Sequence, residues 1–536
     1  MSAHADVTVY ITGATAYRGP AISAFKSFLD GGYVAIYGAK TGVTSESNAA
    51  NVAFRGTSVA NPGLGVVTIK AAWGGSVGGV KLIQSTTTFN IDSQPGVLGW
   101  IPDTALPAGN GVAGSPVIFA GTEDSTNFTI LAADSSGAKS FERGAGAAKP
   151  VAAFSDAFQA SALGGAAGDA VGLGTDTATG KIGVIPFDFV VCNGVTPGSV
   201  TKYVTPTFSS GSNQITYASK AGDLTTGNIG RVIAGAGIPI GTTITADSGT
   251  VLTISANTTA ANTATLTSIS SADTAVAPIS NITANQANQL AQGGGKLSLF
   301  TGNASDAGVG VYLYGRNADS GTRISFLGES GRGITARPSF HLQPTFTPAG
   351  PGSGKGGAPG NLVTGLKKWP TESVLSVVYT SGQSGYTGGG DLAGALSSPG
   401  STSATMDAAT LSGFNPGWMI GYLGRNDARD ACARTFGQNT AKRLTFNGQQ
   451  DWNGTSFNVD GTPVSGYNDT AVREGNYQAW EFEHFFKKAT IPDGGATDTV
   501  LDAIAANILA QSAPGGTISL STMHATRSVE GGPISY

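Results

Sequence analysis

Apolar and polar residues alternate over 6–12 and give way to a helical repeat over 19–30, with Gly13 between the two patterns. Alternation predicts a strand, a repeat of three to four predicts a helix, and glycine at a strand end indicates a turn. The same order of strand, small-residue turn and helix recurs over 65–84, 150–163 and 310–327. Strands that alternate with helices favour parallel sheets, so the sequence predicts an α/β fold whose ligands bind beyond the carboxyl ends of the strands.

Residues 199–272 interrupt this order. They are rich in threonine, alternate between apolar and polar positions, and carry Gly, Pro and Asp turns, which predicts several short strands. We therefore expect a small all-β domain inserted in a loop. A chain of 536 residues exceeds the usual size of one hydrophobic core, so further domains are expected around it.

Charged residues make up 12% of the chain, against about 25% in a typical protein. With a net charge of −4 and no basic run, the sequence excludes a nucleic-acid footprint and a polybasic membrane contact. No apolar run is long enough to predict a transmembrane segment. Two cysteines, Cys192 and Cys432, give neither a disulfide framework nor a metal motif.

The amino terminus bears on localisation. Ala3-His4-Ala5 has the small-x-small form of a signal-peptidase site, although a polar natural terminus explains it equally well. A nearly uncharged, hydroxyl-rich surface suits a protein outside the cytoplasm. We therefore expect a periplasmic or extracellular protein whose export signal has been removed.

The predicted helix starts carry the candidate chemistry. Unpaired amides at a helix start form an anion site, to which hydroxyls add donors and Arg316 adds a forked guanidinium. Asp156 repels an anion unless the ligand carries a proton to donate, as hydrogenphosphate does and sulfate does not. We expect no cofactor and no metal. The hydroxyl donors are those of Thr15, Ser76, Ser155, Ser320 and Thr322.

Seven stretches taken in order resemble periplasmic phosphate-binding proteins of the PstS type. They are "ITGATAYRGP", "AAWGGSVGGVKLI", "AAFSDAFQ", "GRNADSGTR", "SGYTGGGDLAGAL", "GWMIGYLGRNDA" and "GNYQAWEFEHFF". The resemblance implies a type II periplasmic-binding-protein fold, in which two α/β lobes joined by hinge strands close around one phosphate for an ABC-type transporter. It places lobe 1 at 6–190 plus 424–536, lobe 2 at 191–423, and the β insertion within lobe 2.

The resemblance also implies roles for single residues. The turn with Thr15, Ala16 and Tyr17, together with Ser76, gives donors from lobe 1, although Tyr17 stands where phenylalanine is expected. Asp156 accepts the phosphate proton. From lobe 2 the site is closed by Arg316, Ser320, Gly321 and Thr322. The hinge falls near 187–194 and 419–427, which places both cysteines close to the crossovers.

Two other kinds of site have a weaker basis. Gly74–Gly78 matches the G-x-S-x-G nucleophile elbow, but no acid partner is identifiable, so we predict no enzyme. Alternation along a strand sends Glu481 and Glu483 to one face and His484 to the other, which argues against a metal site. The two glutamates are expected in solvent, with the neighbouring aromatic residues packed.

A structural role is the alternative function. A surface or filament protein built on the same scaffold would assemble with copies of itself through the β insertion and the long loops. The edge strands of the insertion carry few of the charged residues that would oppose pairing with another chain. A fold also does not determine a function. The expected partners are therefore phosphate or a related oxyanion, the membrane component of a transporter, or further copies of this chain.

Overall fold

The structure is a computed structural model of the whole chain. It describes residues 6–29, 33–39, 45–85, 99–106, 117–124, 129–132, 138–140, 148–193, 200–222, 229, 232–234, 237–239, 242–261, 268–272, 279–347, 362–398, 400–407, 416–433, 441–458, 460–493, 495–511 and 516–536. The expected cleavage site at Ala3-His4-Ala5 lies outside these residues.

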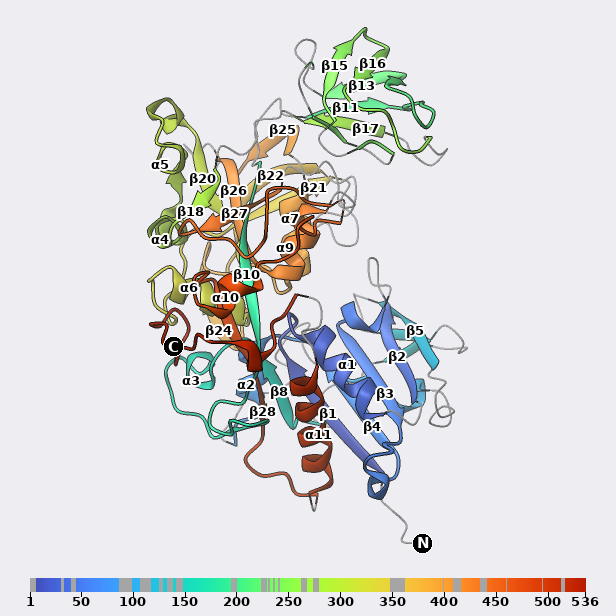
Figure 1. Cartoon of the computed structure of the whole chain (residues 1–536), viewed down its shortest axis with the longest axis vertical. Helices are drawn as coiled ribbons and strands as arrows, with labels where there is room; N and C mark the ends of the chain where they lie inside the picture. The colour runs from blue at the N-terminus through green and yellow to red at the C-terminus, as the bar shows by residue number, and fades with distance from the viewer. Residues whose placement is uncertain are drawn as a thin grey trace.

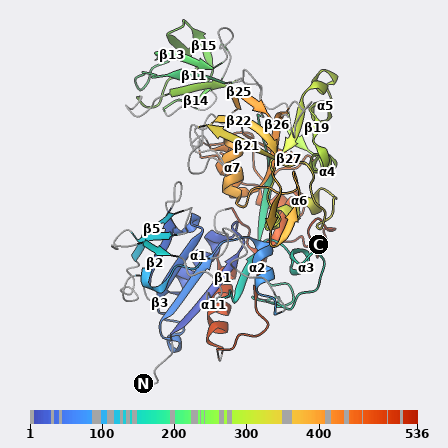
Figure 2. The same ribbon diagram turned by 180° about the vertical axis from the view of Figure 1, so that it is seen from behind.

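The chain is a mixed α/β protein. Within the described ranges, sixteen strands form one mixed sheet that passes through a lower and an upper half of the molecule (Figure 1). Figure 2 shows the same two halves from behind. None of the helices in these ranges combines the length and hydrophobicity that crossing a bilayer requires.

The lower half is built around three neighbouring parallel strands. β1 pairs in parallel with β4 on one side and with β8 on the other. The expected strand, turn and helix around Gly13 are present, since β1 ends at Gly13 and α1 begins at Arg18. The elements of this half are β1 (Val7–Gly13), α1 (Arg18–Phe28), β2 (Tyr33–Ala39), β3 (Asn51–Gly56), β4 (Val67–Ala72), α2 (Ser76–Leu82), β5 (Val117–Asp124), β6 (Thr129–Ala132), β7 (Ala138–Ser140), β8 (Ala152–Ser155), α3 (Gln159–Ala162), β9 (Val171–Gly172), β28 (Trp480–Lys487) and α11 (Ala496–Ala510).

The upper half continues the same sheet. β20 pairs in parallel with β26, and two hydrophobic clusters form its core. Its elements are β18 (Asn281–Ile282), α4 (Ala284–Gly293), β19 (Gly295–Lys296), α5 (Ser298–Thr301), β20 (Gly310–Leu313), α6 (Gly321–Glu329), β21 (Leu342–Thr347), β22 (Leu362–Lys368), β23 (Glu372–Val374), β24 (Val377–Tyr379), α7 (Gly389–Ser397), β25 (Gly400–Met406), β26 (Pro416–Gly424), α9 (Arg425–Cys432), β27 (Lys442–Phe446) and α10 (Asp469–Arg473).

A single long strand, β10 (Lys181–Asn193), joins the two halves. Lys181 to Pro186 pair with β28, whereas Phe187 to Asn193 pair with β26. The change of partner falls between Pro186 and Phe187, where the first expected hinge segment begins. Cys192 is buried on this strand, and both cysteines are reduced thiols in the same core cluster.

The packing differs from the expected lobe bounds over one segment. Leu444, Val472 and Tyr477 belong to the same hydrophobic cluster as Val311 of β20, so β27, α10 and Tyr477 pack in the upper half. The expected boundary at 424 assigned them to lobe 1. The chain re-enters the lower half only at β28 and α11, because β27 pairs with β10 and β18 before that return.

Residues 200–272 form a separate β unit at one end of the molecule, as the threonine-rich alternation predicts (Figure 1). Its strands make a four-stranded and a three-stranded antiparallel sheet. Nine buried residues, among them Tyr203, Ile215 and Leu252, form its own core. The strands are β11 (Val200–Val204), β12 (Gln214–Thr216), β13 (Ser219–Gly222), β14 (Val232–Ala234), β15 (Ile244–Asp247), β16 (Val251–Ile254) and β17 (Ser268–Ala272).

Candidate functional site

Three turns of the lower half meet at one edge of the sheet. Because β4, β1 and β8 are adjacent and parallel, their carboxyl ends lie together. The Gly75 N–H donates to Gly13 O over 3.1 Å, and the Ala14 N–H donates to Phe154 O over 2.9 Å. The turn after β1 therefore contacts the turns after both neighbouring strands.

One carboxylate links these turns to the upper half. Ser76 Oγ at the start of α2 donates to Asp156 Oδ1, and Thr322 Oγ1 in the first turn of α6 donates to Asp156 Oδ2 over 3.0 Å. All three residues are buried. A Cβ at Gly321 would lie 1.8 Å from Asp156 Oδ1, so only glycine fits at this position. Ser76, Asp156, Gly321 and Thr322 are thus brought together.

Asp319 makes a second contact between the halves. Its Oδ1 accepts from the Gly78 N–H over 2.5 Å, and its backbone carbonyl accepts from the Val77 N–H over 3.2 Å. Asp319 therefore caps α2 from the opposite half. Burial raises its pKa to about 7, and the Asp156 charge adds to that, whereas the Gly78 N–H, Lys81 and Arg316 oppose the rise.

Arg316 lies beside this contact and points elsewhere. Its Nε and Nη2 donate to Tyr386 O over 3.2 Å and to Thr387 O over 2.9 Å. A Cβ at Gly389 would lie 1.8 Å from Asp427 Oδ2 and 3.3 Å from Arg316 Nη1, so the guanidinium lies beside the start of α7. Burial raises the pKa of Asp427 to about 6, against the opposing charge of Arg316. The expected fork onto a ligand at Asp156 is not formed here.

Two of the expected hydroxyls serve their own turns. Ser320 is the N-cap of α6 and accepts from the Arg323 N–H over 3.3 Å. Ser155 Oγ donates to Ala157 O over 2.7 Å and accepts from the Ala157 N–H over 3.1 Å. Both side chains are buried next to the converging residues, but their hydroxyls stabilise local structure.

The turn after β1 borders a cavity rather than Asp156. Thr15 and Ala16 line a cavity of about 430 Å³ between the starts of α1 and α9, with Arg18 and Asp427 on its wall. Tyr17 is instead buried, with its ring against Phe154 and its hydroxyl on Ile182 O. Burial raises the pKa of Tyr17 and keeps its hydroxyl protonated. Tyr17 therefore belongs to the core of the lower half.

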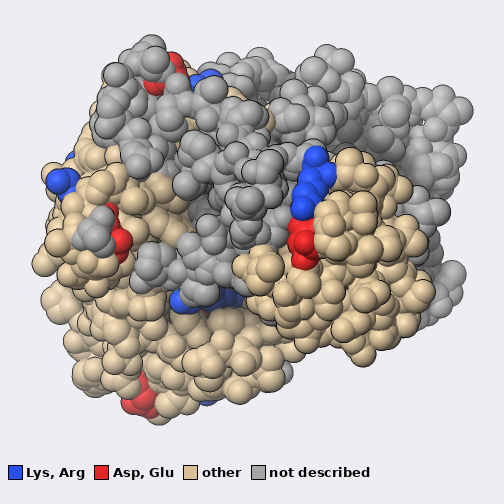
Figure 3. Space-filling view, turned by 90° about the horizontal axis from the view of Figure 1, so that it is seen from above, with Lys and Arg blue, Asp and Glu red and all other residues tan. Residues whose placement is uncertain are grey.

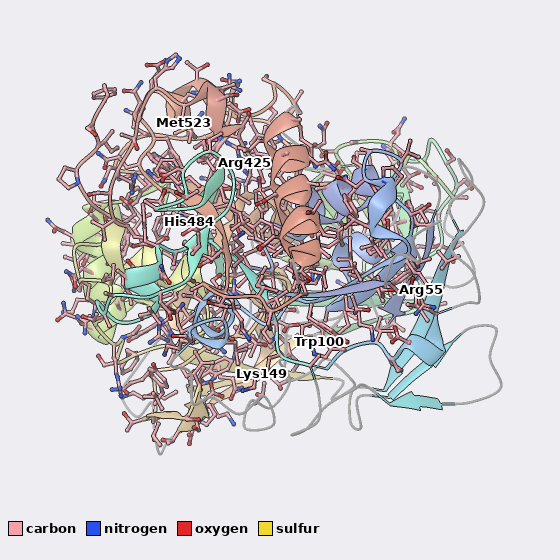
Figure 4. All side chains as sticks on the ribbon, turned by 90° about the horizontal axis from the view of Figure 1, so that it is seen from below. Arg55, Trp100, Lys149, Arg425, His484 and Met523 are labelled. Atoms are coloured by element: carbon pink, nitrogen blue, oxygen red, sulfur yellow. The ribbon has the colours of Figure 1, made fainter. Side chains whose placement is uncertain are left out.

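Two glutamates beside Asp156 were missed, and the expectation that they lie in solvent is wrong. Glu481 is 2% exposed and Glu483 is fully buried. β28 lies between β10 and β8 in the sheet, and its His484, labelled in Figure 4, is fully buried. A strand with apolar residues on one face and acidic residues on the other is expected to expose its acidic face to solvent. Here α6 covers the acidic face, and Ser325 Oγ of α6 donates to Glu481 Oε2. The Trp and three Phe residues of "WEFEHFF" were the available signal of a buried strand.

Burial sets the protonation of this strand. It raises the pKa of Glu481 and of Glu483, and the nearby Asp156 charge adds to both. It lowers the pKa of His484 to about 4, so the imidazole is neutral, with Nδ1 against Thr179 O at 2.6 Å. In the part of the chain that the structure describes, no group of His, Cys, Asp and Glu side chains has the arrangement of a metal site.

Models of known protein families and the curated proteins give no match to this chain. The function therefore has to be argued from the residues and contacts described above.

Proposed function

We propose that the chain is an extracytoplasmic binding protein of the two-lobed type II fold, which captures phosphate or a similar oxyanion between its lobes. One observation carries the proposal. Hydroxyls from opposite halves, those of Ser76 and Thr322, converge on a single buried carboxylate between two helix starts. In this proposal, two oxygens of a tetrahedral oxyanion take over the two hydroxyl donors that the carboxylate oxygens of Asp156 now hold.

Binding requires the anion to replace Asp156 as the acceptor. Ser76 and Thr322 then donate to ligand oxygens, and Asp156 accepts the proton that the ligand carries. The first-turn amides of α6 add donors and a partial positive charge. Arg316 and Arg323, which both donate to backbone carbonyls, contribute positive charge at a distance. No chemical step follows; the bound ion is passed to a membrane transporter.

Closure of the two halves accompanies this exchange. Thr322 and Asp319 belong to the upper half, whereas Asp156 and Gly78 belong to the lower half, so the Thr322–Asp156 and Gly78–Asp319 contacts form only when the halves meet. A ligand that bridges them stabilises the closed state over an open one. β10, which changes its pairing partner at Pro186, is the strand about which the halves would turn.

Calorimetric titration of the purified chain with phosphate and with sulfate tests this function. Ser76→Ala and Thr322→Val should each weaken phosphate binding by about tenfold or more, since each removes a hydrogen bond to a charged group. Ser330→Ala is the matched control, because its buried hydroxyl donates to Leu327 O at the other end of α6. Failure of the unaltered chain to retain phosphate at micromolar concentration would refute the proposal.

Self-assembly is the second candidate, favoured by the separate β unit. The β unit of 200–272 has its own core and lies at one end of the molecule, away from β8 (Figure 1). On the face seen in Figure 3, the described Lys, Arg, Asp and Glu side chains are few and scattered. Sedimentation of the whole chain and of a chain lacking 200–272 would distinguish the two functions. Large assemblies that vanish with the deletion, without phosphate binding, favour the structural role.

A further inference from the structure

Asp156 is surrounded by other buried acids. Glu481 and Glu483 approach it from β28, Glu530 approaches from the carboxyl-terminal segment, and Asp319 approaches from the start of α6. In the described ranges, no lysine or arginine forms an ion pair with Asp156, Glu481, Glu483 or Glu530. Several ionised carboxylates without cations do not share one interior, so some of these acids must be neutral.

The hydrogen bonds identify which acids are neutral. Glu530 accepts from the Phe158 N–H over 2.6 Å and from Ser161 Oγ, so both of its oxygens have donors. Asp156 accepts hydrogen bonds from the hydroxyls of Ser76 and Thr322. Glu481 has only Ser325 on Oε2, and its Oε1 is buried without a donor. A buried carboxyl oxygen without a donor is tolerated when the group is protonated.

Glu481 and Asp156 are also in hydrogen-bonding contact with each other. Since Asp156 already accepts two hydroxyls, it is the acceptor of the pair and Glu481 is the donor. A carboxylate offers about four lone-pair positions. Ser76, Thr322 and Glu481 use three of them here, and the positions that Ser76 and Thr322 leave on binding are open to the hydroxyl of a ligand.

Building on the function proposed above, we propose that Glu481 is a positioning residue that determines specificity. As a neutral acid, it donates a hydrogen bond to Asp156 and leaves Asp156 as the acceptor, and the site then takes only oxyanions that bring a proton of their own. Phosphate and arsenate meet this condition at neutral pH. Sulfate presents no proton and meets a bare carboxylate, which repels it.

Three variants separate this role from simple packing. Glu481→Gln keeps a donor toward Asp156 and an acceptor for Ser325, so phosphate affinity should stay within about threefold of the unaltered chain. Glu481→Leu keeps the volume and removes the donor. Phosphate affinity should then fall by about tenfold or more, and the preference for phosphate over sulfate should fall with it. Glu483→Gln, on the same strand face but without a hydrogen bond to Asp156, is the matched control and should bind like the unaltered chain.

Calorimetric titration at pH 6, 7 and 8 supplies the decisive readout. The ionisation of phosphate itself is common to all variants, so the affinity ratio of the unaltered chain to Glu481→Gln reports Glu481 alone. The ratio should stay within about threefold across this range, because Glu481 keeps its proton. A ratio that changes by about tenfold, or a Glu481→Leu variant that binds phosphate like the unaltered chain, overturns the proposal.

The failure of the inference is distinguishable from the failure of the function. If the unaltered chain does not bind phosphate, the proposed function fails and the inference fails with it. If the unaltered chain binds phosphate and Glu481→Leu binds equally well, only the role of Glu481 is refuted. Should circular dichroism show that Glu481→Leu does not fold, Ser325→Ala replaces it. That variant removes the hydroxyl that holds Glu481 and should weaken phosphate binding by about threefold to tenfold; unchanged affinity contradicts the proposal.

Discussion

Asp319→Asn tests the contact by which the upper half caps α2. Asparagine keeps an oxygen that accepts from the Gly78 N–H, but it does not ionise. In the unaltered chain, burial raises the pKa of Asp319 from 3.8 to about 7. The folded state therefore holds the proton of Asp319 more tightly than the unfolded chain does.

The sign of the pH effect follows from this difference. Stability from the raised pKa is fully present below the unfolded value of 3.8 and is lost as pH rises through about 7. A shift of about three units corresponds to about 4 kcal/mol, of which about 3 kcal/mol is lost between pH 5 and pH 8. Asparagine has no such loss. The stability of Asp319→Asn relative to the unaltered chain should therefore rise by about 3 kcal/mol over this interval.

Urea unfolding followed by tryptophan fluorescence at pH 5 and pH 8 measures the difference. Comparing the two pH values cancels any effect of the substitution that does not depend on pH. Asp502→Asn, at an exposed position of α11, is the control, and its stability relative to the unaltered chain should be the same at pH 5 and pH 8. If the stability difference between Asp319→Asn and the unaltered chain is equal at both pH values, the reasoning that burial raises the pKa of Asp319 is wrong.

Three further outcomes are expected. Gly321→Ala should abolish phosphate binding in a titration, because its Cβ would lie 1.8 Å from Asp156 Oδ1, whereas Gly19→Ala, with open space around it, should bind normally. Glu483→Gln should gain stability relative to the unaltered chain in urea unfolding as pH rises from 4 to 8, since burial raises the pKa of Glu483 and the stability from its proton is lost with rising pH; a constant difference would contradict this. Arg527→Met should lose about 3 kcal/mol in the same assay, because it leaves Glu329 buried and unpaired; adding Glu329→Gln should restore more than half, and no restoration would exclude a buried ion pair.

The parts of the fold that depend on local pattern follow from the sequence. Neighbouring residues around Gly13 are sufficient to predict the strand, the glycine turn and the helix. The threonine-rich alternation of 199–272 is also a pattern of neighbouring residues. Convergence of Ser76 with Asp156 also follows, because parallel adjacent strands end at the same edge of a sheet. The mixed α/β class is confirmed on this basis, while the transport function stays a proposal.

Features that depend on distant partners were not predictable in the same way. Arg316 turns toward carbonyls at Tyr386 and Thr387, about seventy residues along the chain, and nothing near Arg316 indicates them. Asp319 caps α2 although it lies 241 residues after Gly78 in the sequence, so no capping pattern is visible around either residue. The burial of Glu481 arises because α6 covers β28, which the alternation of that strand alone does not indicate.

The closed arrangement places a carboxylate at each of two helix starts, Asp319 at α2 and Asp156 at α6. Under the proposed function, the ligand therefore competes with the protein's own acceptors, and its affinity is the difference between two satisfied states rather than the sum of new contacts. Such a site gains little from a weakly matched anion, since that anion displaces Asp156 without giving it a proton in return. An anion that supplies the proton restores the acceptor it displaced. Selectivity then comes from the cost of leaving the Asp156 oxygens that Ser76 and Thr322 vacate without a donor in buried surroundings.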